Sequence, residues 1–281
     1  LPTRPCGTRV SSSSPQRRYL VKRLALVTAL TAVVLIPACT TSMSLSDARS
    51  ISERDGILYL DDVPLPHHRE VSVEGILETG SLLFMRTALG AIDVSGVPGS
   101  NVNLTIDLYS EYEGDGEVQI DGEEITTFSN VRGKLLVNGI RGTIPEGTSL
   151  RVHSSTGEIS LAGFAGESSI RIASGTGEIR MSNCGINDLD INTGTGNIFL
   201  DQVQIDDLLI SSGTGDLSAE GSSFRTLRGT SGTGSFKLRG SSVVQARIES
   251  GTGDLVLVDS TVSERFESLG TGDVVIKSSQ D

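Results

Sequence analysis

Apolar and polar residues alternate in a pattern that repeats every 19 residues through the C-terminal half of the chain. Over short segments of each repeat, every second residue is apolar, which is the period of a strand that turns one face inward. No stretch of a repeat shows the period of a helix. One repeat illustrates the inward positions with Ile198, Leu200, Ile205, Leu208 and Ile210.

A Thr-Gly pair marks the same point of every repeat. Stacking such repeats would place like residues above one another at about 4.8 Å, so we predict a solenoid with two to three short strands per turn. Glycine permits positive φ at a sharp corner, and threonine is expected to stack on threonine. The pairs stand at 156–157, 176–177, 195–196, 214–215, 233–234, 252–253 and 271–272, so the first interval is 20 residues and the next five are 19.

The last repeat departs from the pattern. Arg265 and Glu267 stand where apolar residues are expected, with Phe266 between them. A terminal turn has no neighbour to cover its core, so these charged residues are expected to form a polar cap.

The part of the chain before the regular repeats is less periodic. Residues 71–153 contain alternating segments and are predicted to form irregular N-terminal β turns, with a surface loop at Glu111–Glu117, while 154–281 form the regular solenoid. Residues 39–70 are polar and charged and are expected to be a tether.

Residues 21–38 have the three-part plan of a secretory signal. Lys22 and Arg23 precede an apolar run from Leu24 to Ile36, which is too short for a membrane span of about 20 residues. Because the chain begins with Leu1, we interpret residues 1–20 as an over-extended start and Val21 as the initiator.

The segment Ile36-Pro37-Ala38-Cys39 resembles the lipobox of bacterial lipoproteins. The resemblance implies that Cys39 is acylated, becomes the first residue of the mature chain and holds the protein to a membrane in the cell envelope. Thr40 follows the cysteine, which in Gram-negative families implies the outer membrane.

The repeats also resemble a known family. The sequences Gly142–Leu150 and Ser154–Leu161, with the later Gly-Thr-Gly-Asp-Leu repeats, look like the bacterial putative-adhesin β-strand-repeat family, a domain of unknown function. The resemblance covers roughly residues 80–278 and implies an all-β fold, a right-handed parallel β-helix (β-solenoid) on the cell envelope. It supplies no catalytic residues to carry over.

Charge excludes one class of partner. Without residues 1–38, which hold six basic residues and no acid, seventeen basic residues face thirty-five acidic ones, for a net charge of −18. Such a surface repels phosphate backbones, so no nucleic-acid binding is expected. Divalent cations and cationic partners stay open.

The residue after each Thr-Gly pair forms a second, mostly acidic column. Its carboxylates Glu178, Asp216, Asp254 and Asp273 are the candidate calcium ligands, but one carboxylate per turn supplies few of the six to eight oxygens that calcium needs. A solvated polar edge is the favoured interpretation, with no metal. The full column is Glu158, Glu178, Asn197, Asp216, Ser235, Asp254 and Asp273.

No catalytic constellation is evident. No Gly-x-Gly copy leads into a helix, as a phosphate loop requires, and no nucleophile elbow is present. His67 and His68 fall in the tether, His153 falls on an early strand, and Cys184 is expected to be a small buried side chain. We therefore expect no enzyme and no cofactor.

The expected function is that of a lipid-anchored envelope module that binds, adheres or serves as a scaffold. Its partners would be the membrane, through the anchor, and envelope proteins or glycans. The alternative is a polysaccharide-binding or polysaccharide-active β-helix protein, with a basic patch for an acidic glycan. That patch would consist of Arg225, Arg228, Lys237, Arg239 and Arg247.

The lipobox generates a direct test. Replacing Cys39 with Ala removes the thiol that receives the lipid, so Cys39→Ala should lose labelling by a fatty-acid probe and appear in the soluble fraction. Two acyl chains hold a protein at a membrane where one does not. Unchanged membrane retention of Cys39→Ala would refute the anchor.

Overall fold

The computed structural model describes residues 50–78 and 80–278, and in these the chain forms twenty-four strands. No helix in this part of the chain is long and apolar enough to cross a membrane. The expected over-extended start, signal segment and Cys39 lie outside the described residues.

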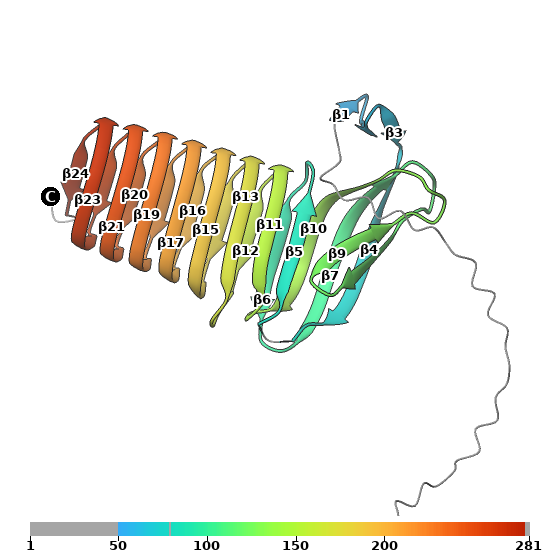
Figure 1. Cartoon of the computed structure of the whole chain (residues 1–281), viewed down its shortest axis with the longest axis horizontal. Coiled ribbons are helices and arrows are strands. Elements are labelled where there is room, and N and C mark those ends of the chain that lie inside the picture. The colour runs from blue at the N-terminus through green and yellow to red at the C-terminus, as the bar shows by residue number, and fades with distance from the viewer. Residues whose placement is uncertain (1–49, 79, 279–281) are drawn as a thin grey trace, which may run out of the picture. The chain divides into compact units, whose positions relative to one another are not determined.

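Each regular turn of the chain contributes one short strand and one long strand (Figure 1). The short strands are β12 (Ile159–Ala162), β14 (Ile179–Ser182), β16 (Ile198–Asp201), β18 (Leu217–Glu220), β20 (Phe236–Arg239), β22 (Leu255–Val258) and β24 (Val274–Lys277). The long strands are β11 (Ser149–Thr156), β13 (Ser169–Thr176), β15 (Gly185–Thr195), β17 (Gln204–Thr214), β19 (Ser223–Thr233), β21 (Ser242–Thr252) and β23 (Thr261–Thr271).

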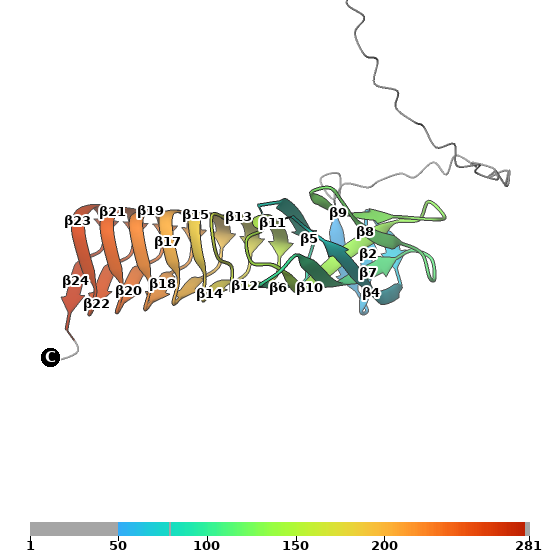
Figure 2. The same ribbon diagram turned by 90° about the horizontal axis from the view of Figure 1, so that it is seen from below.

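The strands of successive turns pair in parallel and build two facing sheets (Figure 2). Leu208 of β17 stands beside Leu227 of β19, and Ile198 of β16 stands beside Leu217 of β18. Both steps are 19 residues, so the β-solenoid with 19-residue turns is confirmed.

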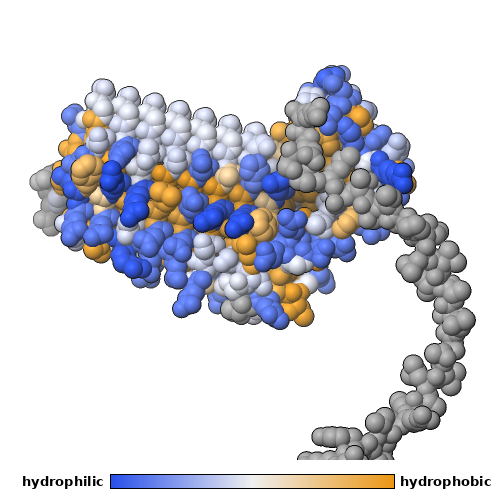
Figure 3. Space-filling view, viewed as in Figure 1, coloured by the Kyte–Doolittle hydropathy of each residue, from blue (hydrophilic) through white to orange (hydrophobic). Residues whose placement is uncertain are grey.

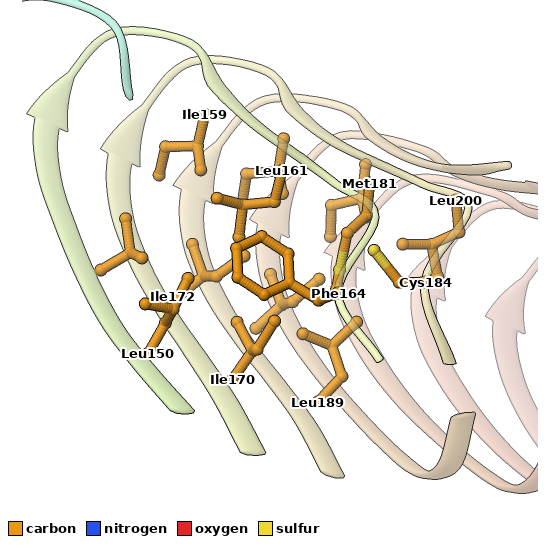
Figure 4. Packing of buried hydrophobic residues seen from close by; sticks show 14 of the residues in the cluster. Leu150, Ile159, Leu161, Phe164, Ile170, Ile172, Met181, Cys184, Leu189 and Leu200 are labelled. Atoms are coloured by element: carbon orange, nitrogen blue, oxygen red, sulfur yellow. The ribbon is translucent and has the colours of Figure 1, made fainter. Parts of the chain in front are cut away.

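Apolar columns fill the space between the two sheets (Figure 4). Leu238 is fully buried and Leu217 is 3% exposed, as their offsets in the repeat predict. Gly229 occupies a column position that isoleucine holds in neighbouring turns, and a Cβ there would lie 2.3 Å from the ring of Phe236. The phenylalanine therefore fills the volume that the glycine leaves, which keeps the core packed.

Two glycine columns form the Thr-Gly corners, each for its own reason. Gly215, after the threonine, has φ +142°, and a Cβ on it would lie 2.0 Å from the carbonyl oxygen of Gly196 one turn earlier. Gly213, before the threonine, needs no positive φ, but its Cβ would lie 2.5 Å from the oxygen of Gly194. Positive φ therefore explains the glycine after the threonine only. Close approach of the backbones explains why both positions require glycine.

The opposite corner of each turn holds a buried column of small side chains. The hydroxyl oxygen of Ser222 accepts the amide N–H of Val203, and that of Ser241 accepts the amide N–H of Ser222, each at 3.2 Å. Cys184 lies next to Phe164 and Met181, buried and free, as expected (Figure 4). Burial raises the pKa of its thiol, so Cys184 is a poor nucleophile.

The solenoid begins before the first Thr-Gly pair. Strands β5 (Leu82–Thr87) and β6 (Ile92–Val97) form a further turn that stacks on β11 and β12. Residues 98–148 are inserted between these two adjacent turns. The inserted strands are β7 (Asn101–Ser110), β8 (Glu117–Asp121), β9 (Glu124–Phe128) and β10 (Leu135–Pro145).

The inserted strands extend both sheets with mixed pairing. Beyond β6 one sheet continues with β10, β7 and β4 (His67–Ile76), and beyond β5 the other continues with β9 and β8. The acidic loop falls between β7 and β8 as expected. Within it Asp115 is only 3% exposed, because it accepts hydrogen bonds from the Ser129 hydroxyl at 2.6 Å and the Asn130 amide at 2.8 Å.

The expected tether of residues 39–70 is wrong for its described part. Residues 51–65 form an antiparallel sheet of β1 (Ile51–Arg54), β2 (Ile57–Leu60) and β3 (Val63–Leu65). Leucines at 58, 60 and 65 pack with Ala88 and Leu136 in a small core of their own. The sequence feature that indicates this hairpin is Asp55-Gly56, a turn dipeptide in which both residues have positive φ.

The last turn carries the expected polar cap. Arg265 and Glu267 continue the inward columns of Ala246 and Ile248, and their side chains form an ion pair at 2.9 Å. The pair is about a quarter to a third exposed, at 31% and 26%. Charged groups over the end of the core disfavour addition of a further strand.

Candidate functional site

The acidic column lies along the Thr-Gly corners and serves as a ladder of hydrogen-bond acceptors. From Asn197 to Asp254, a side-chain oxygen of each residue in the column accepts the backbone N–H of its counterpart in the next turn. The donor and acceptor pairs are Asp216 to Asn197 at 3.0 Å, Ser235 to Asp216 at 2.8 Å, Asp254 to Ser235 at 3.1 Å and Asp273 to Asp254 at 2.9 Å. Figure 3 shows the neighbouring Thr-Gly corners as a row of residues of near-neutral hydropathy where the long strands end.

The four candidate calcium ligands are not brought together. Glu178 pairs with Arg180, whose Nε also bonds Glu158 at 2.9 Å. The turns of Asn197 and Ser235 separate Glu178, Asp216 and Asp254 from one another. No three His, Cys, Asp or Glu side chains in the described part of the chain are grouped so as to hold a metal ion. The oxygens of Asp216 and Asp254 instead satisfy backbone amides.

The predicted basic patch is divided between two faces. Arg225, Arg228 and Arg247 project from the long strands β19 and β21, whereas Lys237 and Arg239 belong to β20 of the other sheet. Arg225 forms an ion pair with Asp206 at 2.5 Å, and Arg247 bonds Glu249 at 2.8 Å. Because carboxylates already engage two of the five cations, a glycan patch is not assembled there.

The histidines lie on strands rather than in a tether. His68 projects from β4, with its ring 4.6 Å from that of Tyr109 and its Nε2 3.9 Å from Asp107. His67 begins the same strand. His153 lies on β11 and lines a pocket of the described structure.

That pocket has a volume of about 560 Å³ and lies where the regular stacking ends. Its walls are the outward residues of β5, β11, β13 and β15 on one side and Glu124–Thr127 of β9 on the other. β9 pairs with β5 only at Glu124 and Phe84, so the two strands separate beyond this point. The separation leaves the pocket within the ten-stranded sheet, between β5 and β9.

Three arginines from three successive turns line the polar part of the pocket. Arg151 and Arg171 are directly paired neighbours on β11 and β13, and Arg86 lies beside His153 on β5. The guanidinium of Arg151 lies over the Phe84 ring at 5.0 Å, and Arg171 approaches Asp190 at 3.8 Å. The parallel register therefore concentrates cations that are far apart in the sequence.

The pocket is electropositive although the protein is acidic. Its described lining holds Arg86, Arg151 and Arg171 against two carboxylates, Glu124 and Asp190. Desolvation and the positive charge of Arg86 both lower the pKa of His153, so this imidazole stays neutral at neutral pH. A neutral imidazole can donate and accept hydrogen bonds beside the arginines, an arrangement that suits an anionic ligand.

Apart from Thr126, Thr127 and Asn192, the remainder of the lining is apolar. Phe84 and Ile125 are half-buried, whereas Val137 and Ile140 belong to β10 of the opposite sheet and are nearly fully buried. The pocket therefore reaches from the outer face of one sheet to the margin of the core, where Val137 and Ile140 are 5% and 2% exposed. The other apolar lining residues are Met85, Val152 and Ile172.

Sequence reasoning missed this site because its parts lie in unlike segments. Arg151 precedes the first Thr-Gly pair, and Arg171 lies in the 20-residue interval before the strict 19-residue repeats begin. Arg86 belongs to a turn whose corner reads Leu89-Gly90-Ala91. The one available signal was the continuous apolar run Leu82-Leu83-Phe84-Met85, which is consistent with a strand but does not alternate as the later turns do.

Comparison with known families supports the fold. The family model Toastrack DUF4097 matches residues 97–281, about two thirds of the chain. The chain belongs to this family. A search of curated proteins finds no match. The matched range of the Toastrack domain starts at the end of β6, so the pocket combines strands of the matched range with β5, which precedes it.

Two solved structures resemble the chain at low identity. One is a putative lipid binding protein from Parabacteroides distasonis, with 13% identity and a TM-score of 0.28, covering 75% of this chain and 96% of that one. The other is a putative cell adhesion protein from Clostridium sporogenes, with 11% identity and a TM-score of 0.27, covering 75% of this chain and all of that one.

The acceptor ladder predicts a difference between two substitutions of Asp216. Asp216→Asn keeps an oxygen for the Ser235 amide, as Asn197 does naturally, and should leave the free energy of unfolding nearly unchanged. Asp216→Ala loses the acceptor and should cost ~0.5–1 kcal/mol in urea unfolding. Calcium should raise the melting temperature of the wild type no more than magnesium does.

Two results would contradict this account of the ladder. Equal losses for Asp216→Asn and Asp216→Ala would show that the charge matters rather than the acceptor. A rise in melting temperature specific to calcium, lost in the double variant Asp254→Asn, Asp273→Asn, would restore the metal site.

Proposed function

We propose that this chain is a lipid-anchored protein of the cell envelope that acts as a binding module, and that the pocket between β5 and β9 holds an anionic ligand. The observation that carries the proposal is the gathering of Arg86, Arg151 and Arg171 around one pocket of an otherwise acidic protein. Acylated Cys39 attaches the module to a membrane, which is the outer membrane in a Gram-negative cell.

The lining supports binding rather than catalysis. Among the described residues that line the pocket, Thr126 and Thr127 supply the hydroxyls, and neither serine nor cysteine is present. Asp190 faces Arg171, and His153 faces Arg86 rather than a carboxylate that could orient it. Such a set holds an anion through charge-assisted hydrogen bonds but offers no activated nucleophile.

An acidic glycan is the second candidate for the ligand. Asn192 and the arginines could hydrogen-bond its hydroxyl and carboxylate groups across the outer faces of β11, β13 and β15. Arg151 already covers the Phe84 ring, which leaves less aromatic surface for a sugar to stack on. The glycan interpretation therefore depends on the outer half of the pocket alone.

The proposal predicts that an anionic probe will bind through the pocket arginines. The fluorescent anion 8-anilinonaphthalene-1-sulfonate should bind the wild type and lose at least ~10-fold in affinity in Arg151→Gln, Arg171→Gln, since a charge-assisted hydrogen bond contributes ~1.5 kcal/mol or more. The matched control is Arg228→Gln, Arg247→Gln, two arginines of the same outward column that lie outside the pocket.

The control variant should bind the probe as the wild type does. Equal binding by all three proteins, or loss in the control alone, would refute the pocket as the binding site.

A further inference from the structure

We infer that the ligand of this pocket is a single-chain anionic amphiphile, with its headgroup at Arg86, Arg151 and Arg171 and its chain against the apolar lining beside β9. The inference rests on the proposed function, since it assigns a chemical class to the anion proposed above. It follows from the way in which the polar and apolar lining residues are separated along the pocket.

The two kinds of lining residue occupy different depths. Arg151, Arg171 and Asn192 lie on the outer faces of their strands and are exposed. Val137 and Ile140 lie in the opposite sheet, 5% and 2% exposed, among residues of the main core. A molecule that fills the whole pocket must therefore present charge at one end and hydrocarbon at the other.

A small polar anion would use only half of this site. It would meet the arginines but leave the half-buried apolar side chains of Phe84 and Ile125 without an apolar partner, whereas burial of a hydrocarbon chain against them is favourable. A neutral or cationic amphiphile would fill the inner part but leave three guanidinium groups near an uncharged or like-charged headgroup. Only an anionic headgroup with an apolar chain matches both ends.

The strand arrangement provides the entry. Past the one Phe84–Glu124 pair, β5 and β9 do not continue as paired strands, so the polar backbone at this point is not closed by a ladder. Ile125, which is half-buried, lies on the β9 side of the gap. A volume of about 560 Å³ lies in the range of sites for one drug-sized molecule, which favours one chain of medium length over a two-chain lipid.

Isothermal titration calorimetry on the folded protein with a series of alkyl carboxylates tests the inference. From hexanoate to dodecanoate, each below its micelle concentration, affinity should rise about fourfold per methylene, which corresponds to ~0.8 kcal/mol. Dodecyl phosphate should bind as dodecanoate does. Acetate, inorganic phosphate and dodecyltrimethylammonium should bind at least ~100-fold more weakly.

Variants separate the two halves of the site. Arg151→Gln, Arg171→Gln should weaken dodecanoate and dodecyl phosphate at least ~10-fold, while Arg228→Gln, Arg247→Gln leaves both unchanged. Ile125→Phe narrows the entry at a half-buried position and should weaken the long chains more than hexanoate. Circular dichroism melting of each variant verifies that it is folded, and Ile125→Asn serves as the second variant at this position.

The outcomes divide the two proposals. If inorganic phosphate or an acidic oligosaccharide binds through Arg151 and Arg171 as tightly as dodecanoate, the amphiphile is refuted and the anion site stands. If no anion depends on these arginines, both fail. Binding to phosphatidylglycerol vesicles without binding to monomeric dodecanoate or dodecyl phosphate would also refute the pocket, because the surface rather than the cavity would then recognise the lipid.

Discussion

Close stacking of backbone on backbone at the Thr-Gly corners is the constraint on which the rest of the structure depends. The amide of Gly196 donates to the carbonyl of Thr214, and that of Gly215 to Thr233, at 2.9 and 3.0 Å. With no room for a Cβ between turns, each corner sits on the corner before it. The 19-residue register then fixes every other column, apolar or polar, because a strand's side chains alternate strictly between its two faces.

The candidate site lies where this stacking is interrupted. The insertion of residues 98–148 between two adjacent turns lets β10 and β9 take places that a further regular turn would fill. β10 continues its sheet, but β9 pairs with β5 at one position only, so the two strands separate beyond it. The same register that stacks apolar columns inside also stacks Arg151 on Arg171 outside. The pocket combines both effects, half-buried apolar side chains beside β9 and a concentrated positive charge.

The regular turns could be predicted from the sequence, whereas the pocket could not. A strict 19-residue period also defines which residues of successive turns are paired. The burial of positions such as Leu208 and Leu238 could therefore be predicted by counting along the repeat. The contact of β9 with β5 joins segments without a shared pattern, and it is long-range pairing of this kind that periodicity does not encode. The sheet of β1 to β3 was missed for a different reason. Because most residues around this sheet are polar, its buried leucines were not recognised as a core, although Asp55-Gly56 is typical of a hairpin turn.

Replacing a corner glycine tests the stacking most directly. Gly215→Ala places a Cβ 2.0 Å from the Gly196 oxygen at a φ of +142°, whereas Gly185→Ala meets nothing within 4 Å and has no positive φ. In urea unfolding followed by circular dichroism, Gly215→Ala should lose at least ~2 kcal/mol of stability from strain and separation of the turns, while Gly185→Ala stays within ~1 kcal/mol of the wild type. Equal stability of the two variants would contradict the claim that backbone contact at the corners sets the fold.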